Sequence, residues 1–306
     1  MNTNILAKFP KNVLEMSTDE RMKFLDSFDI VFSDVDGVIW DIMPPGPIPG
    51  VSEGIEFLQS KGKKVVYVTN NSLRPIKENI KRFHEYGIPV KEDDIVHPAQ
   101  SIVELLKQIK FTGLIYCLAS TSFKDHLRNA GFELMDGPII LDETFTELVR
   151  VLFDNHPVKA VIMDIDFTIS AVKLMKAHIY LKKDSECLLI GGAADPLGYF
   201  ANHEIIGNGP FINLVENSSK VEAKVLGKPG LELIKFLKSK YGIEQSQRAL
   251  FVGDSPCSDV KFGKISGFQT MAVLTGGAKL SDLKKCLDDE SPDFYINSLA
   301  DFKGFL

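Results

Sequence analysis

Four short segments of this chain carry side chains that could together transfer a phosphoryl group. They contribute two closely spaced carboxylates, a hydroxyl with two amides, a lysine held between turn residues, and two further carboxylates. In chain order they read Ser33-Asp34-Val35-Asp36-Gly37, Thr69-Asn70-Asn71-Ser72, Gly227-Lys228-Pro229 and Gly253-Asp254-Ser255-Pro256-Cys257-Ser258-Asp259. Each segment is placed where a predicted strand ends, which is where open parallel sheets bind their ligands.

The residue types indicate a metal-assisted reaction of a phosphate. Clustered carboxylates repel one another, so a pocket lined by them is costly unless a cation occupies it. Ligands that are all oxygen favour a hard ion, and Mg²⁺ is the expected one. It would cancel the repulsion between Asp34 and the phosphate it attacks. Lys228 would add a second positive charge and Thr69 a hydrogen bond, which is the charge stabilisation that phosphoryl transfer requires.

Asp36 is placed to serve as a general acid and base. It could protonate the leaving oxygen and then activate water against the phosphorylated enzyme, help that is typically worth about 10²–10⁴ in rate. Each segment alone also has a purely structural explanation. Asp-x-Asp-Gly is often a turn with a helix cap, Thr-Asn-Asn-Ser is often a cap, and Gly-Lys-Pro is usually a surface turn. These explanations would require four strand ends to carry a complementary set by chance.

The elements that must position these side chains alternate between strands and helices. Short apolar runs rich in Val and Ile, each followed by a turn and a helical stretch, favour an α/β fold with parallel sheets covered on both faces. A helix is expected over about 50–61 and another from near Pro75, where proline suits a first helical turn. The predicted strands are Ile30–Ser33, Val65–Thr69, Leu114–Leu118, Val158–Met163, Cys187–Ile190, Leu250–Val252 and Met271–Leu274.

The chain has 306 residues, about twice the usual length of a single domain. Gly-rich and Pro-containing breaks allow residues 99–218 to form a separate α/β unit inserted into a core built from residues 1–98 and 219–306. Periodicity alone leaves open a single long sheet.

Composition limits the kinds of partner. The net charge is −6, so no basic field attracts nucleic acid or an anionic membrane. The four cysteines are scattered, no run approaches the length of a membrane span, and the first ten residues lack the apolar core of a signal peptide. A reduced, cytoplasmic compartment is the expected location, and a small phosphorylated metabolite is the expected substrate.

The four segments, in this order, resemble the motifs of the haloacid dehalogenase (HAD) superfamily. Asp34-Val35-Asp36-Gly37-Val38-Ile39-Trp40, then Pro49-Gly50 before a helix, then Val68-Thr69-Asn70-Asn71-Ser72 resemble the branch of 4-nitrophenylphosphatases, phosphoglycolate phosphatases, pyridoxal phosphate phosphatase (chronophin) and NagD-type enzymes. The resemblance extends from about residue 28 to residue 274. It implies a doubly wound parallel-sheet core with a large inserted α/β cap, which often mediates formation of a homodimer.

The resemblance also implies roles for individual residues. Asp34 would be the nucleophile of a Mg²⁺-dependent phosphatase and Asp36 its acid and base, with an aspartyl-phosphate intermediate. Thr69 and Lys228 would hold the phosphate. The metal ligands would be Asp34, the backbone carbonyl of Asp36, and Asp254, with Asp259 acting through water or a lysine contact. Gly37, Asn70 and Asn71 are expected to lie against the substrate.

Two cap segments depart from the pattern of the branch. Relatives often read Gly-Phe-Asp where this chain has Met163-Asp164-Ile165-Asp166, and Thr-Asn-x-Asp where it has Gly192-Ala193-Ala194-Asp195. Since these segments face the active site in the branch, we hypothesise that Asp166 or Asp195 contacts the substrate. Solvated turn residues are the simpler alternative.

Other classes of protein fit less well. A dehalogenase needs neither Asp36 nor a metal, and a receiver domain is shorter and lacks a cap. No glycine-rich dinucleotide fingerprint or P-loop is present. A phosphotransferase shares the first half of the reaction, and a non-catalytic binding protein could keep the fold, so both stay open.

Overall fold

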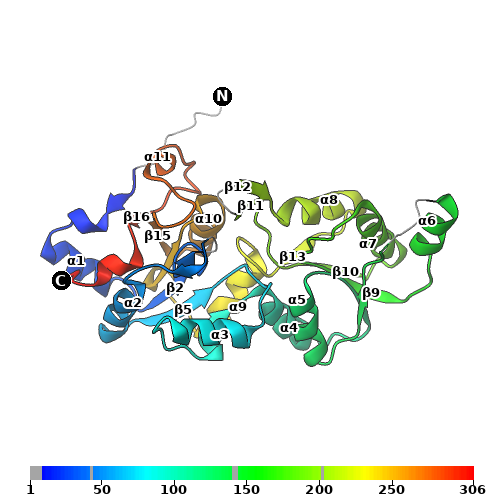
Figure 1. The fold of residues 1–306 in the computed structure, drawn as a ribbon, viewed down its shortest axis with the longest axis horizontal. Helices are drawn as coiled ribbons and strands as arrows, with labels where there is room; N and C mark the ends of the chain where they lie inside the picture. The colour runs from blue at the N-terminus through cyan, green and yellow to red at the C-terminus, as the bar shows by residue number, and fades with distance from the viewer. Residues whose placement is uncertain (1–8, 42–43, 140–143, 201–202) are drawn as a thin grey trace.

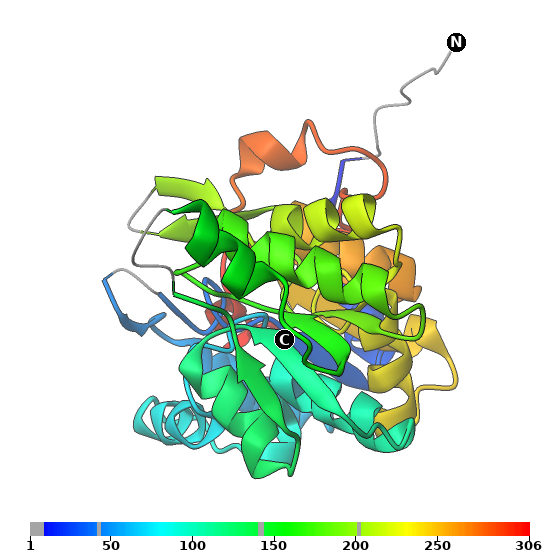
Figure 2. The same cartoon turned by 90° about the vertical axis from the view of Figure 1, so that its right-hand side faces the viewer.

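The computed structural model describes residues 9–41, 44–139, 144–200 and 203–306. Within these ranges the chain forms two separate parallel sheets that lie side by side along the long axis of the molecule (Figure 1). Helices cover both faces of each sheet, and the view along that axis shows this for the smaller one (Figure 2). The expected α/β class is confirmed, and the alternative of one long sheet is not what the chain forms.

The larger sheet, the core sheet, contains seven strands among the described residues, in the order β1-β16-β15-β14-β2-β5-β6. All of its pairings are parallel. Its strands are β1 (Lys11–Asn12), β2 (Ile30–Ser33), β5 (Lys64–Val68), β6 (Ile95–Val96), β14 (Ala249–Gly253), β15 (Gln269–Val273) and β16 (Phe294–Ile296). Strand β2 is buried along its whole length, as expected for an apolar strand at the centre of a parallel sheet.

Successive side chains of the core strands enter two different hydrophobic clusters. Val31, Val65 and Val252 pack on one face with α1 (Thr18–Asp26), α2 (Val51–Ser60) and α3 (Ile76–Glu85). Phe32, Val66 and Phe251 pack on the other face with α9 (Leu231–Tyr241) and α10 (Lys261–Ser266). This alternation with a period of two is what fixes each strand between two layers of helices.

The smaller sheet, the cap sheet, contains five strands among the described residues, in the order β13-β10-β9-β7-β8. Its strands are β7 (Leu114–Leu118), β8 (Leu134–Asp136), β9 (Val158–Met163), β10 (Leu188–Gly191) and β13 (Ala223–Val225). One face packs on α4 (Pro98–Gln108) and α5 (Thr121–Asn129), and the other on α7 (Ala171–Lys183) and α8 (Gly209–Ser219). We call the part from α4 to β13 the cap.

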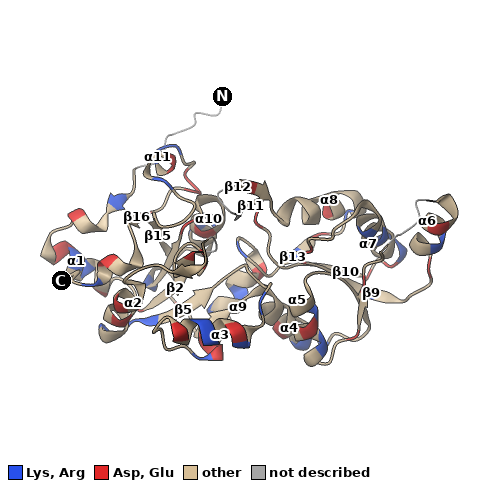
Figure 3. Ribbon diagram, in the orientation of Figure 1, with Lys and Arg blue, Asp and Glu red and all other residues tan. Residues whose placement is uncertain are grey.

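Two helices and two small antiparallel ladders of the described residues also lie outside the two large sheets. Helix α6 (Phe145–Leu152) and the antiparallel hairpin of β11 (Leu197–Phe200) and β12 (His203–Ile206) belong to the cap, while the small ladder of β3 (Trp40–Asp41) with β4 (Gly46–Pro47) and helix α11 (Leu280–Leu283) belong to the core. Acidic and basic residues are interspersed along the helices of both parts (Figure 3). Among the described residues no helix is long and apolar enough to cross a membrane.

The predicted division at residues 98/99 and 218/219 stays a prediction. Strand pairing adds one fact to it, because β13 follows residue 218 in sequence and yet pairs with β10 of the cap sheet. The chain therefore returns to the core between β13 and α9, and Lys228 lies in that connection.

Candidate active site

The core sheet brings three of the four polar segments to one edge. Asp34 follows β2, Thr69 follows β5 and Asp254 follows β14, and these three strands are neighbours in the sheet. The amide of Asp34 donates to the carbonyl of Val252 over 2.8 Å, and the amide of Thr69 donates to the carbonyl of Val96 over 2.9 Å. Each side chain therefore leaves the sheet from a backbone that is still held by the ladder.

Lys228 joins this edge from the connection after β13 and forms the centre of a buried ion-pair cluster. Its Nζ lies 2.7 Å from Asp34 Oδ1 and 2.7 Å from Asp259 Oδ1. Only 2% of the lysine is exposed. Burial opposes its charge, but Asp259 and Asp34 outweigh this effect and raise the pKa of Lys228. The lysine is therefore held as a cation beside the predicted nucleophile.

Asp259 is fully engaged by protein groups. Its second oxygen accepts hydrogen bonds from the backbone amides of Asp254, over 3.1 Å, and Ser255, over 3.0 Å. It lies on a short helical turn, Pro256–Val260, which begins after Asp254 and Ser255 at the end of β14. Of its two expected modes of action, through water or through a lysine, the structure contains the lysine contact. A direct metal-ligand role for Asp259 stays a prediction.

Asp254 and Gly37 are packed against each other. A Cβ atom built on Gly37 would lie 2.4 Å from Asp254 Oδ2, and the φ of Gly37 is +80°, so the position favours glycine on two grounds. The Gly37 amide donates to the Trp40 carbonyl over 2.8 Å, and its carbonyl accepts from Thr275 Oγ1 over 2.6 Å. The lack of a side chain at Gly37 leaves room for the carboxylate of Asp254. Both backbone groups of Gly37 already have protein partners, and its predicted contact with substrate stays a prediction.

The carboxylates suit a hard cation. Oxygens of Asp34, Asp254 and Asp259 lie within 4.8 Å of one another. Both oxygens of Asp259 are occupied, by Lys228 and by two backbone amides. Asp34 bonds to Lys228 through one oxygen, and Asp254 accepts the Gly277 amide over 2.6 Å through one oxygen. Asp34 and Asp254 are therefore the better metal donors. Burial, with the charge of Asp259, raises the pKa of both Asp34 and Asp254, the latter to about 7. An oxygen-only pair that is costly to ionise without a cation fits Mg²⁺.

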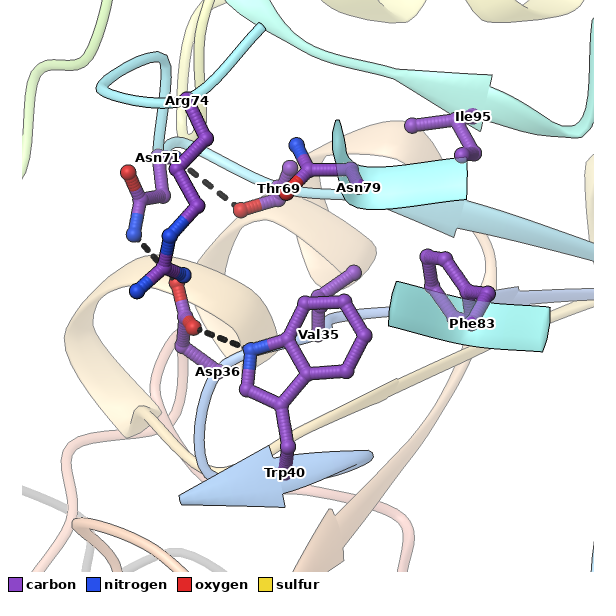
Figure 4. A pocket seen from close by; sticks show the side chains of 9 residues that line it. All are labelled: Val35, Asp36, Trp40, Thr69, Asn71, Arg74, Asn79, Phe83 and Ile95. Carbon is purple, nitrogen blue, oxygen red and sulfur yellow. Dashed lines mark hydrogen bonds between the residues drawn. The ribbon is translucent and has the colours of Figure 1, made fainter. Parts of the chain in front are cut away.

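Asp36 is held by a second set of contacts, shown in Figure 4. Its two oxygens accept from Trp40 Nε1 over 2.7 Å and from Asn71 Nδ2 over 2.8 Å. Trp40 is 2% exposed and packs on Phe83 with ring centroids 4.7 Å apart. These two donors fix the orientation of the predicted acid and base, and Asn71 acts here as its partner.

Thr69 keeps a proton that can be donated. Its Oγ1 accepts the backbone amide of Asn71 over 3.0 Å, so the hydroxyl hydrogen is available to an acceptor at the strand end. Thr69 is 5% exposed and lies in the same small pocket as Asp36, Asn71 and Arg74 (Figure 4).

Asn70 clamps the lysine connection. Its Oδ1 accepts the Lys228 amide over 2.8 Å, and its Nδ2 donates to the Lys228 carbonyl over 2.9 Å and to Asp195 Oδ2 over 2.7 Å. The predicted contacts of Asn70 and Asn71 with substrate stay predictions, since the structure shows both side chains bonded to protein groups.

The two cap carboxylates hypothesised to contact substrate lie in different surroundings. Asp166 bonds within the cap, to Lys173 Nζ over 2.8 Å and to Thr168 Oγ1 over 2.6 Å. Asp195 crosses to the core, where it accepts from Asn70 and, over 2.6 Å, from Ser258 Oγ. A further bond between the two parts joins Ser72 Oγ to Asp164. Ser72, Asp164 and Ser258 all lie in or beside the segments singled out above, but nothing local in the sequence pairs them.

Two models of known families match this chain. A haloacid dehalogenase-like hydrolase model matches residues 31–133, and a HAD-hydrolase-like model matches residues 225–302. Phosphoglycolate phosphatase 2 of Arabidopsis thaliana is 30% identical over 291 residues, which are 94% of this chain and 96% of that protein. The chain belongs to the haloacid dehalogenase family of hydrolases, which confirms the resemblance that the four segments indicate.

Solved structures share the whole fold. The p-nitrophenyl phosphatase of Archaeoglobus fulgidus matches with a TM-score of 0.74 at 24% identity and covers 92% of this chain and 100% of that one. The glycerol phosphate phosphatase of Mycobacterium tuberculosis, solved in complex with magnesium, matches with a TM-score of 0.68 at 19% identity, over 96% of this chain and 78% of that one. With phosphatases as its curated relatives, the chain is a phosphoric monoester hydrolase.

Proposed function

We propose that this protein is a Mg²⁺-dependent phosphatase that hydrolyses small phosphomonoesters through an aspartyl-phosphate on Asp34. The observation that carries the proposal is the buried cluster in which Lys228 lies 2.7 Å from both Asp34 and Asp259. A cation fixed beside a carboxylate at the end of a central strand neutralises the two anions that must approach each other.

The residues then act in two steps. In the first, a carboxylate oxygen of Asp34 attacks phosphorus, the bond from phosphorus to the ester oxygen breaks, and Asp36 gives its proton to that oxygen. In the second, Asp36 takes a proton from water, the water oxygen attacks phosphorus, and the carboxylate of Asp34 is released. Lys228 and the Thr69 hydroxyl bind the phosphate oxygens throughout. Mg²⁺ held by Asp34, Asp254 and the backbone carbonyl of Asp36 would supply further positive charge.

Hydrolysis of p-nitrophenyl phosphate tests the proposal and its main alternatives. We expect turnover with Mg²⁺ and none with EDTA. Adding an alcohol as a phosphate acceptor separates a hydrolase from a phosphotransferase, because a phosphotransferase would release nitrophenol faster than inorganic phosphate. No turnover on this ester or on a panel of natural phosphomonoesters, with Mg²⁺ present, would favour a binding protein that keeps the fold.

The pH dependence of cation binding gives a prediction that needs no substrate. The pKa of Asp254 is raised from 3.8 to about 7, so its ionisation opposes folding of the metal-free protein. The free energy of unfolding in EDTA should therefore fall as the pH rises through that window. A divalent cation must displace the proton, so we expect Mg²⁺ to raise the melting temperature more at about pH 8 than at about pH 5.5. Equal shifts at both pH values, or the same shifts in Asp254→Asn, would contradict the assignment.

Arg74 favours substrates that carry a second anionic group. It lines the pocket that contains Asp36 and Thr69, and it forms no ion pair with a carboxylate among the described residues (Figure 4). A free carboxylate on the group that is esterified to phosphate, as in phosphoglycolate, would supply the missing partner. We expect Arg74→Gln to raise KM for phosphoglycolate by about tenfold, because one charged contact is lost. KM for p-nitrophenyl phosphate, which has no second anionic group, should rise by less than about twofold. The exposed Lys77→Ala is the matched control, and equal changes for both substrates would remove this role.

A homodimer through the cap is part of the proposal. Phe145, Val149 and Phe153 are spaced four residues apart along α6 and its end, and they are 81%, 39% and 65% exposed. An apolar stripe of this kind on a cap helix offers a surface for a second copy of the chain. We expect the double variant Phe145→Ser/Phe153→Ser to sediment as a monomer where the wild type sediments as a dimer. A monomeric wild type would contradict the prediction. The cytoplasmic location and the absence of nucleic-acid and membrane partners stay predictions.

A further inference from the structure

Asp195 is a cap residue whose carboxylate bonds to two core loops beside the Lys228 ion-pair cluster, at Asn70 and at Ser258. It lies between β10 and the β11–β12 hairpin, and its backbone carbonyl accepts the amide of Gly209 over 3.0 Å at the start of α8. Its side-chain carboxylate accepts hydrogen bonds from Asn70 and Ser258, which belong to the core. The residue is therefore fixed to the cap by its backbone and to the core by its carboxylate.

The first of these contacts leads to the lysine. Asp195 Oδ2 accepts from Asn70 Nδ2 over 2.7 Å, and the same amide group bonds to the Lys228 carbonyl over 2.9 Å. Asn70 Oδ1 in turn accepts the Lys228 amide over 2.8 Å. Both bonds to the backbone of Lys228 depend on the orientation of the Asn70 amide. Because Asp195 fixes that orientation, it helps to hold Lys228 in place indirectly, through Asn70.

The second contact leads to the partner of that lysine. Asp195 Oδ1 accepts from Ser258 Oγ over 2.6 Å, and Ser258 directly precedes Asp259 on the short turn after β14. Ser258 is 3% exposed and Asp259 is 1% exposed, so this turn has little freedom to adjust without its contacts. One carboxylate thus restrains the backbones of both residues that form the Lys228–Asp259 ion pair.

The cap and the lysine connection are closely packed beside Asn70. A Cβ atom built on Gly227, next to the lysine, would lie 2.5 Å from the Gly192 carbonyl of the cap and 2.8 Å from Asn70 Oδ1. Burial raises the pKa of Asp195, against the bonds from Ser258, the charge of Lys228 and the bond from Asn70. A buried carboxylate whose two oxygens are both bonded to core side chains has no free oxygen in this arrangement for a substrate.

We propose that Asp195 is a positioning residue, one that couples the placement of the cap to the Lys228–Asp259 ion pair, and not a residue that contacts substrate. The proposal rests on the phosphatase function given above. When the cap is seated, the bonds from Asn70 and Ser258 set the lysine and its partner for the reacting phosphate. When these bonds are lost, the lysine connection and the Asp259 turn can move independently.

Substitutions at Asp195 separate geometry from charge. In Asp195→Asn, the new amide oxygen can accept from Asn70 and the new NH₂ can donate to Ser258 Oγ, because a hydroxyl also accepts. Both bonds survive without the charge. Asp195→Ala removes both bonds. Ser258→Ala removes one of them and leaves Asp195 in place. Asp184→Ala, which breaks a cap ion pair with Lys159, is the matched control.

The experiment measures kcat, KM and melting temperature of these variants on p-nitrophenyl phosphate, phosphoglycolate and glycerol phosphate with saturating Mg²⁺. We expect Asp195→Ala to lower kcat by about tenfold to a hundredfold, to the same extent for every ester that the wild type hydrolyses. We expect Asp195→Asn to stay within about threefold of wild type, Ser258→Ala to fall between them, and Asp184→Ala to match wild type.

Two other results would overturn the proposal. A loss that differs among the esters and lies mainly in KM would make Asp195 a substrate contact. A lower melting temperature with unchanged kcat would leave it a purely structural residue. If Asp195→Ala does not fold, Ser258→Ala carries the same test. Activity of the wild type, measured first, keeps these outcomes separate from a failure of the phosphatase assignment itself.

Discussion

Replacement of Asp34 by asparagine is expected to abolish turnover while leaving the protein folded. The amide has nearly the shape of the carboxylate but cannot act as the nucleophile, so we expect kcat to fall by at least about 10³-fold, the scale seen when a covalent nucleophile is removed. The assay is p-nitrophenyl phosphate hydrolysis with Mg²⁺, beside a melting curve of the same sample.

The stability of this variant should change in the opposite direction from its activity. Burial and the charge of Asp259 raise the pKa of Asp34, so at neutral pH its ionised form costs free energy in the folded state. A neutral asparagine removes that cost, and we expect an equal or higher melting temperature in EDTA. Residual activity above about one per cent of wild type would contradict the role of Asp34 as nucleophile.

Lys228→Met is expected to damage both activity and stability. The substitution keeps most of the apolar stem and removes the charge, which leaves Asp34 and Asp259 buried without their common partner. Breaking a buried ion pair from one side costs about 3–5 kcal/mol. We expect a fall in melting temperature of several degrees together with a loss of about 10³ in kcat.

A double variant separates the two effects of the lysine. In Lys228→Met/Asp259→Asn the unpaired charge of Asp259 is gone, so the melting temperature should recover in part while the activity does not. A wild-type melting temperature in Lys228→Met alone would contradict this prediction. It would show that water reaches the ion-pair cluster more than the 2% exposure of Lys228 indicates.

Much of this site follows from local sequence. Largely apolar runs such as Ile30–Ser33 and Val158–Met163 coincide with β2 and β9, because strands covered by helices on both faces need mainly apolar side chains. Polar residues that directly follow such runs must lie at strand ends. Asp34, Thr69 and Asp254 could therefore be assigned to one edge before the order of the strands was known.

The parts that could not be predicted depend on contacts between distant segments. Nothing near Asp195 in the sequence indicates that it bonds to Asn70 and Ser258, since those bonds exist only once the cap is seated on the core. The same holds for Ser72 with Asp164. Strand β13 is short and only partly buried, so its apolar pattern in the sequence is weak. Its position in the cap sheet is known only from its pairing with β10 in the structure.

The role of Trp40 in orienting Asp36 could not be predicted from the sequence. It is part of the segment that indicates the family, yet the sequence says nothing of its indole. In the structure that group donates to Asp36 over 2.7 Å while the ring packs on Phe83 and Arg82 stacks over it at 4.4 Å. A buried tryptophan with one polar atom needs a partner for that atom, and the nearest carboxylate of its own loop supplies it.

The most direct test of the central claim is chemical trapping of the intermediate. Wild-type protein turning over p-nitrophenyl phosphate is quenched in acid, reduced with borohydride and digested, and the peptide that contains Asp34 is examined by mass spectrometry. An acyl phosphate on Asp34 would be reduced to homoserine, and we expect this product only when Mg²⁺ and substrate are both present. Label on another residue, or steady turnover with Asp34 unmodified under conditions that trap a known aspartyl-phosphate enzyme, would contradict the mechanism.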